Sequence, residues 1–175
     1  MPKPWWLPLW KIYWNLRHHF GQSSKKGPDT VPDFALLATD NKPHRLYDKL
    51  PGRVTLLWLT NFCESCLEKI PFLSDLKARH GDRLNIYAIT ILRNDDTTPR
   101  IMAKKYHPPF PILLDPDDWV ENVLGLPHPD VACPLYNFLV IDESGRIKYR
   151  AHLSAVSEQS VREVIERELD AIKTD

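Results

Sequence analysis

Two uninterrupted apolar runs of strand length lie in the middle of the chain, at residues 54–59 and 84–91. Continuous apolar runs of this length are typical of strands that are covered on both faces. Between them, residues 63–79 place leucine or isoleucine at three-residue steps with charged residues on the other side, which predicts an amphipathic helix. A strand, a helix and a second strand in this order favour two parallel strands joined by a right-handed connection. The helix therefore begins at the carboxyl end of the first strand.

The last third of the chain carries a hairpin pattern followed by a helix pattern. Residues 136–142 and 146–151 have the pattern of two strands on either side of a turn with Gly145, which predicts an antiparallel hairpin and makes the sheet mixed. Ser157 is expected to cap a terminal helix that packs on the sheet. Its apolar stripe consists of Val161, Val164, Ile165, Leu169 and Ile172.

Two short connecting helices are predicted from the residues at their ends. Thr98 is expected to cap the first of them, with Pro99 at its first position. Asp115 is expected to cap the second, with Pro116 at its first position and Gly125 at its end.

The first 27 residues differ in composition from the rest of the chain. They hold four of the six tryptophans and five cations but no acid, and a polar linker, QSSKKGPDT at residues 22–30, joins them to the rest of the chain. Over the whole chain, 23 Lys and Arg balance 23 Asp and Glu, so no general field favours nucleic acid as a partner. The sequence therefore predicts an arm, residues 1–27, and a globular domain, residues 28–175.

The arm has two interpretations that the sequence leaves open. Trp6, Trp10 and Trp14 lie at four-residue steps, so a helix here would present one aromatic face. Such a face with nearby cations favours peripheral contact of residues 5–20 with an anionic membrane surface, or it packs on the domain or on a second copy. Pro8 breaks an apolar run already shorter than the roughly 20 residues of a membrane span, and no signal peptide is recognisable. We expect a cytoplasmic or membrane-associated protein.

The cysteines indicate redox chemistry. Three cysteines do not form a disulfide framework, and two of them, Cys63 and Cys66, form a CxxC at the expected helix start. Backbone N–H groups and the helix dipole there favour a thiolate on Cys63. We expect Cys63 to attack a disulfide and Cys66 to resolve the mixed disulfide, without a cofactor. The acidic neighbour Glu64 opposes thiolate formation, which predicts a reductant.

Several motifs resemble the redoxins of the TlpA and ResA type. Residues 31–73 carry the PDF opening, the G-[KR]-V strand and the C-x-x-C-x-x-x-x-P helix with Pro71, while residues 110–115 and 139–147 are similar to F-P-x-x-x-D and F-L-I-D-x-x-G-x-I. The resemblance covers about residues 31–173. It implies a thioredoxin-like three-layer α/β/α sandwich with a mixed central sheet. It also implies a thiol–disulfide oxidoreductase that acts on protein disulfides, with an external thiol or reductase as electron donor.

The chain departs from this family at the motif and at the cis-proline. Phe62 replaces the usual Trp before the first Cys, and Ser65 stands where the motif often has Pro. The family's cis-proline faces the CxxC and shapes the substrate groove. The usual spacing leads to Tyr136, and the nearest proline, Pro134, is the candidate for this role. Cys133 would then be an accessory thiol near the active sulfurs.

Two alternative functions are left open. Thr60 stands three residues before Cys63, as in the peroxidatic T-x-x-C, but Leu56 replaces the usual proline four residues before that Thr. A thiol peroxidase of the peroxiredoxin type is therefore one alternative. The other is a non-enzymatic module that binds a metal or docks a partner through Cys63, Cys66 and Cys133, although the main hypothesis includes no metal.

Overall fold

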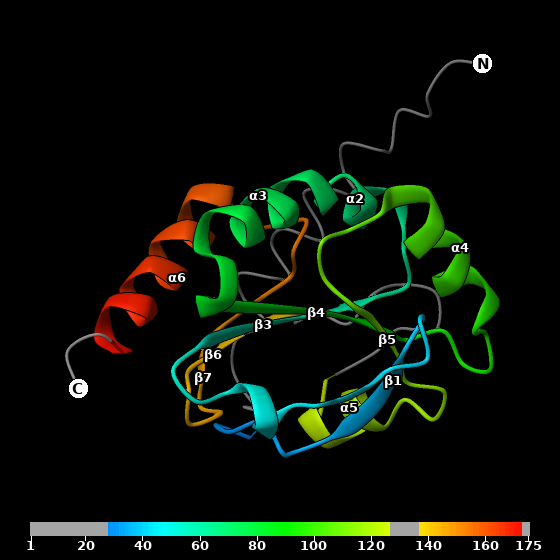
Figure 1. Ribbon diagram of the computed structural model, residues 1–175, viewed down its shortest axis with the longest axis horizontal. Coiled ribbons are helices and arrows are strands. Elements are labelled where there is room, and N and C mark those ends of the chain that lie inside the picture. Colours follow the sequence, from blue (N-terminus) through cyan, green and yellow to red (C-terminus); the bar gives the residue numbers. More distant parts are fainter. Residues whose placement is uncertain (1–27, 127–136, 173–175) are drawn as a thin grey trace, which may run out of the picture.

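The computed structural model describes residues 28–126 and 137–172, in which one mixed sheet lies between helices (Figure 1). The sheet has seven strands in the order β2-β1-β5-β4-β3-β6-β7. The strands are β1 Ala35–Ala38, β2 Pro43–Arg45, β3 Val54–Thr60, β4 Leu84–Thr90, β5 Ile112–Leu114, β6 Phe138–Ile141 and β7 Ile147–Ala151. The helices are η1 Tyr47–Lys49, α2 Glu64–Leu67, α3 Ile70–His80, η2 Gly81–Arg83, α4 Thr97–Tyr106, α5 Trp119–Leu124 and α6 Glu158–Ile172.

The middle of the sheet is parallel, as the sequence predicts. β3 and β4 pair in parallel over their full length, from Val54 opposite Leu84 to Thr60 opposite Thr90. β5 adds a third parallel strand beside β4, whereas β6 runs antiparallel to β3 and forms a hairpin with β7. The predicted mixed sheet and the predicted hairpin are both confirmed.

β3 and β4 separate two hydrophobic cores. Alternate residues of β3 pack into different cores, because successive side chains of a strand point to opposite faces. Leu56 and Trp58 join the core beneath α3 and α6, and Leu57 and Leu59 join the core that contains α5. The layers are visible in Figure 1, with α2, α3, α4 and α6 above the sheet and α5 below it. All seven residues of β3 are buried, which explains its uninterrupted apolar run.

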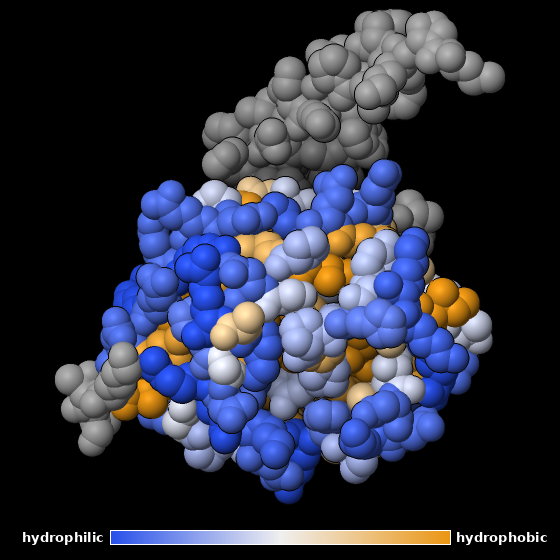
Figure 2. Space-filling model, turned by 45° about the horizontal axis from the view of Figure 1, so that its top comes forward, coloured by the Kyte–Doolittle hydropathy of each residue, from blue (hydrophilic) through white to orange (hydrophobic). Residues whose placement is uncertain are grey.

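The outer surface of the larger helical layer is mostly hydrophilic. Figure 2 turns this face toward the viewer and shows mostly hydrophilic residues, with smaller hydrophobic areas between them. Within the described parts of the chain, no helix is both long and apolar enough to cross a bilayer.

The helix expected over residues 63–79 is divided into two in the structure. α2 ends at Leu67, and α3 begins at Ile70 with Pro71 in its first turn. Proline lacks the N–H that an interior helical residue donates, but it fits the first turn of a helix. The apolar positions of the pattern nevertheless have the expected role, since Leu73 and Leu76 are fully buried.

Both connecting helices begin differently from the prediction. α4 starts at Thr97, and Asp95, rather than Thr98, accepts the N–H groups of Thr97 and Thr98 at 3.0 and 2.9 Å. Aspartate side chains form such turns readily because they can accept a hydrogen bond from the backbone two or three residues ahead.

In the second connecting helix, Asp115 does satisfy N–H groups, but Pro116 is not the first helical residue. α5 starts at Trp119, and the Asp115 carboxylate accepts the N–H groups of Trp119 and Val120 at 3.0 and 2.8 Å. The predicted end is confirmed, since Gly125 is the left-handed C-cap residue.

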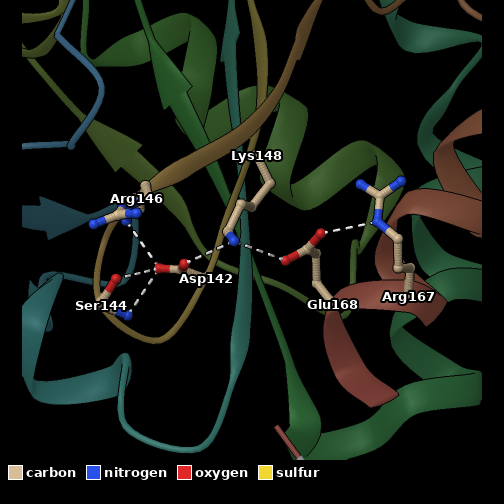
Figure 3. A network of polar contacts seen from close by, with 6 residues as sticks. All are labelled: Asp142, Ser144, Arg146, Lys148, Arg167 and Glu168. Atoms are coloured by element: carbon tan, nitrogen blue, oxygen red, sulfur yellow. Dashed lines mark hydrogen bonds and ion pairs between the residues drawn. The ribbon is translucent and has the colours of Figure 1, made fainter. Parts of the chain in front are cut away.

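The terminal hairpin and α6 are joined by a polar network, shown in Figure 3. In the hairpin turn, Asp142 accepts hydrogen bonds from the backbone N–H groups of Ser144 and Arg146, each at 2.9 Å. Lys148 on β7 lies 3.3 Å from Asp142 and 3.4 Å from Glu168 on α6. The predicted cap of α6 is confirmed by the hydrogen bond from the N–H of Ser160 to the Ser157 hydroxyl oxygen at 3.1 Å.

Leu73→Ala is expected to lower the free energy of unfolding by about 2–5 kcal/mol, because it leaves a cavity in a core that surrounds this residue completely. Leu37→Ala is the matched control. Leu37 is 52% exposed, so its truncation should cost less than about 0.5 kcal/mol. Urea unfolding of both variants measures the difference, and equal losses would contradict this account of the core.

Candidate active site

The CxxC lies where β3 ends and α2 begins. β3 ends at Thr60, Cys63 is the N-cap residue of α2, and Cys66 lies within that helix. The side chain of Cys63 is partly exposed, whereas Cys66 is 0% exposed. One sulfur can therefore meet an external disulfide while the other is shielded from solvent.

A strained turn connects β3 to Cys63. Phe62 has a φ of 60°, in the left-handed region that residues other than glycine rarely occupy. Two side chains stabilise this turn. The Thr60 hydroxyl oxygen accepts the N–H of Phe62 at 2.9 Å, and the side-chain oxygen Oδ1 of Asn61 accepts the N–H of Cys63 at 3.0 Å. The buried Phe62 ring packs edge-on against Trp58, with centroids 6.3 Å apart. The residue that replaces the expected Trp thus anchors the turn to the core.

Ser65 adds a polar group beside the exposed sulfur. Its hydroxyl lies 3.4 Å from Cys63 Sγ, and either atom could be the donor. Proline, which often stands at this motif position in the resembling family, has no such group. The carbonyl oxygen of Cys63 accepts the N–H groups of Cys66 and Leu67, both at 2.9 Å, which fixes the first turn of α2.

Asn137 is a site residue that the sequence analysis missed. It is 0% exposed, precedes β6, and donates from Nδ2 to Cys66 Sγ at 3.7 Å. Its Oδ1 accepts the N–H of Leu153 at 2.8 Å, and its main-chain carbonyl accepts the N–H of Leu59 at 2.8 Å. A polar residue at the start of an apolar strand pattern was the available signal, but its partner is 71 positions away in the sequence.

Three predicted features lie outside the described residues: Cys133, Pro134 and the aromatic arm of residues 1–27. Their expected roles stay predictions. After residue 126, the next described residue is Asn137, whose side chain lies beside Cys66.

Thr60, the basis of the peroxidase alternative, is buried, and its hydroxyl oxygen accepts the N–H of Phe62 in the turn before Cys63. For the metal-binding alternative, no group of three or more His, Cys, Asp or Glu side chains within residues 28–126 and 137–172 could hold an ion. Cys133, the third thiol of that alternative, is not among those residues.

Buried carboxyl groups gather two strands away from the CxxC, after the carboxyl end of β5. Asp115, Asp118 and Glu121 are all buried, and Arg93 forms an ion pair with Asp118. Burial raises the pKa of Glu121 to about 7, and the negative charge of Asp118 adds to this increase. Burial also raises the pKa of Asp115, although two backbone N–H groups oppose it.

A cavity of about 250 Å³ lies at the same edge of the sheet. Its lining includes Thr90, Leu92 and Asp115. Thr90 pairs with Thr60 in the β3–β4 register, so the cavity opens one strand away from the strand that leads to Cys63.

The family model described as Redoxin matches residues 26–165. The chain belongs to the redoxin family. This redoxin is 26% identical over 148 residues to the thiol-disulfide oxidoreductase ResA of Geobacillus thermodenitrificans (strain NG80-2). The matched region covers 82% of this chain and 76% of that protein. Family membership together with the CxxC confirms the expected enzyme class, a thiol–disulfide oxidoreductase.

Two solved structures from Mycobacterium tuberculosis resemble this redoxin in fold. A secreted disulfide oxidoreductase homologous to E. coli DsbE has a TM-score of 0.61 and 20% identity, and covers 77% of this chain and 95% of its own. Peroxidoxin BcpB has a TM-score of 0.62 and 19% identity, and covers 86% of this chain and 98% of its own. Such likenesses show the fold alone, and they confirm the predicted thioredoxin-like sandwich.

Glu121→Gln is expected to make this redoxin more stable than the unchanged chain above pH 7. Because the folded-state pKa of Glu121 is raised from 4.5 to about 7, folding retains a proton that the unfolded chain releases. The contribution of Glu121 to the free energy of unfolding is therefore complete below about pH 4.5 and is lost as the pH rises through 7. Gln keeps the uncharged state at every pH.

Urea unfolding at about pH 5.5 and about pH 8.5 measures this difference. Glu163→Gln, which changes an exposed Glu on α6, is the control and should leave the pH dependence unchanged. A Glu121→Gln variant that loses stability between the two pH values as steeply as the unchanged chain would refute the assignment.

Proposed function

We propose that this redoxin reduces disulfides in protein substrates through the dithiol of Cys63 and Cys66. In the first step, the Cys63 thiolate attacks a substrate disulfide, forms a mixed disulfide and releases one substrate thiolate. In the second, the Cys66 thiolate attacks Cys63 Sγ, which forms the Cys63–Cys66 disulfide and releases the second substrate thiolate. Two electrons pass from the dithiol to the substrate. The observation that carries the proposal is the exposure of Cys63 above a fully buried Cys66.

Regeneration requires two electrons from outside the chain. An external thiol or a reductase would attack the Cys63–Cys66 disulfide and restore both thiols. The proposed direction, reduction of the substrate, rests on the acidic neighbour Glu64, which is exposed beside Cys63. Residues 28–175 would form the catalytic domain, and Pro134 would shape the groove in which the substrate disulfide lies.

Cys63→Ser is expected to lower the rate of insulin disulfide reduction by at least about a hundredfold, because it removes the attacking thiolate. Cys66→Ser should instead accumulate a mixed disulfide between Cys63 and the substrate, visible by intact mass. Ser65→Ala, which retains both thiols, is the matched control and should keep its turnover within about threefold of the unchanged chain, since it removes one hydroxyl contact.

Alkylation followed by peptide mapping provides the independent readout. After mild oxidation, alkylation should be blocked at Cys63 and Cys66 together and restored by dithiothreitol. Persistent turnover in Cys63→Ser, or a disulfide that pairs Cys133 instead, would contradict the proposed roles.

We also propose that residues 5–20 contact an anionic membrane surface, with the domain in the cytoplasm or at its membrane face. The support is the spacing of Trp6, Trp10 and Trp14 together with the cations of the arm. The intact chain should float with vesicles that contain anionic lipid, and alanine at the three tryptophans should abolish flotation. Equal flotation of the two proteins, or flotation of neither, would contradict membrane contact.

A further inference from the structure

The side-chain amide of Asn137 presents a hydrogen-bond donor to the sulfur of Cys66. Its orientation is determined by the opposite end of the amide, where Oδ1 accepts the N–H of Leu153 at 2.8 Å. A backbone N–H can only donate, so the atom that faces Leu153 must be the oxygen. The –NH₂ group therefore points to Cys66 Sγ, 3.7 Å away.

Cys66 is fully buried, at 0% exposure. Its sulfur belongs to the core beneath α3 and α6, together with Trp58, Phe62 and Leu73. Cys63, Tyr106 and Tyr149 pack against this core, and the Arg162 guanidinium lies over the ring of Phe72, which belongs to it. A thiolate in such a place loses its hydration, which opposes its formation unless a donor compensates.

We propose that Asn137 stabilises the Cys66 thiolate and thereby accelerates the resolving step. The inference rests on the proposed function, because only that function requires an anionic Cys66. In this step the Cys66 thiol gives its proton to solvent, its sulfur bonds to Cys63 Sγ, and the substrate sulfur leaves with the electron pair of the broken bond. Hydrogen bonds to an ionised acceptor are about twice as strong as those between neutral groups, so the amide favours the anion over the thiol.

The same contact affects the equilibrium as well as the rate. A disulfide sulfur is a weaker acceptor than a thiolate, so Asn137 stabilises the reduced pair more than the oxidised pair. This effect makes the dithiol less reducing, opposite in direction to the effect of Glu64. Loss of the amide donor should therefore make the pair more reducing as well as slower to resolve.

Asn137→Asp tests the donor with little change in shape. One carboxylate oxygen can still accept the N–H of Leu153, while the other replaces the donor that faces Cys66. Asn85→Asp is the matched control, because Asn85 also donates through Nδ2, to the Lys49 carbonyl at 2.7 Å and to Thr55 Oγ1 at 3.2 Å.

The probe is dipyridyl disulfide, which releases one coloured thiopyridone in each step. The first release reports attack by Cys63, and the second reports resolution by Cys66, so stopped-flow absorbance separates them in the full-length protein. Asn137→Asp should slow the second release about tenfold or more at neutral pH and move its pH midpoint upward, as expected for loss of a hydrogen bond to a charged group. The first release should change less than twofold, and Asn85→Asp should alter neither.

Equal effects of Asn137→Asp on both releases, or no effect on the second, would overturn the inference. A single release in the unchanged chain would instead refute the proposed function, so the two failures are distinguishable. A second measurement, on the unchanged chain, tests the inference even if Asn137→Asp fails to fold. The side-chain ¹⁵N–¹H signals of Asn137 should shift on oxidation of the CxxC and titrate with the midpoint of the second release, and signals indifferent to both would also overturn the inference.

Discussion

Burial of β3 on both of its faces is the constraint on which the rest of the structure depends. Its alternate residues enter two separate cores, and its neighbours β4 and β6 hold it in register along its length. Because this strand cannot shift without exposing one of the cores, its carboxyl end is a fixed point. The turn from Thr60 to Cys63 is built on that point, and its unfavourable backbone geometry at Phe62 is held by two side-chain acceptors and a buried ring. The reactive sulfur is thus placed by packing that lies beneath it.

The parts of the fold that depend on local patterns could be predicted from the sequence. β3, β4, the final hairpin and α6 each have enough residues for a hydrophobic period or a cap to be recognised, and each was found. β1, β2 and β5 are three or four residues long, and they are strands because of distant partners, as in the pairing of Ala35 with Arg45 and of Leu37 with Leu114. The helix starts at Thr97 and Trp119 were misplaced because aspartates further upstream form the turns that precede them.

The candidate site divides in the same way. The CxxC and its placement at a helix start follow from neighbouring residues, so Cys63 and Cys66 were selected directly as candidates. Asn137 and the carboxyl groups of Glu121 and Asp118 gain their chemical character from burial and from partners that are distant in the chain, which no local spacing encodes. Pro134 was selected by its resemblance to a family position, and its role stays a prediction.

The complete burial of Cys66 also bears on how this site withstands oxidants. A peroxide reaches the partly exposed Cys63 first and converts it to a sulfenic acid, which is vulnerable to irreversible further oxidation. In α2 the shielded thiol of Cys66 lies one turn away, ready to condense with that sulfenic acid into a disulfide with release of water. The product is the same reducible disulfide that the proposed cycle forms. Oxidative damage at Cys63 is therefore diverted into a state that an external thiol can reverse.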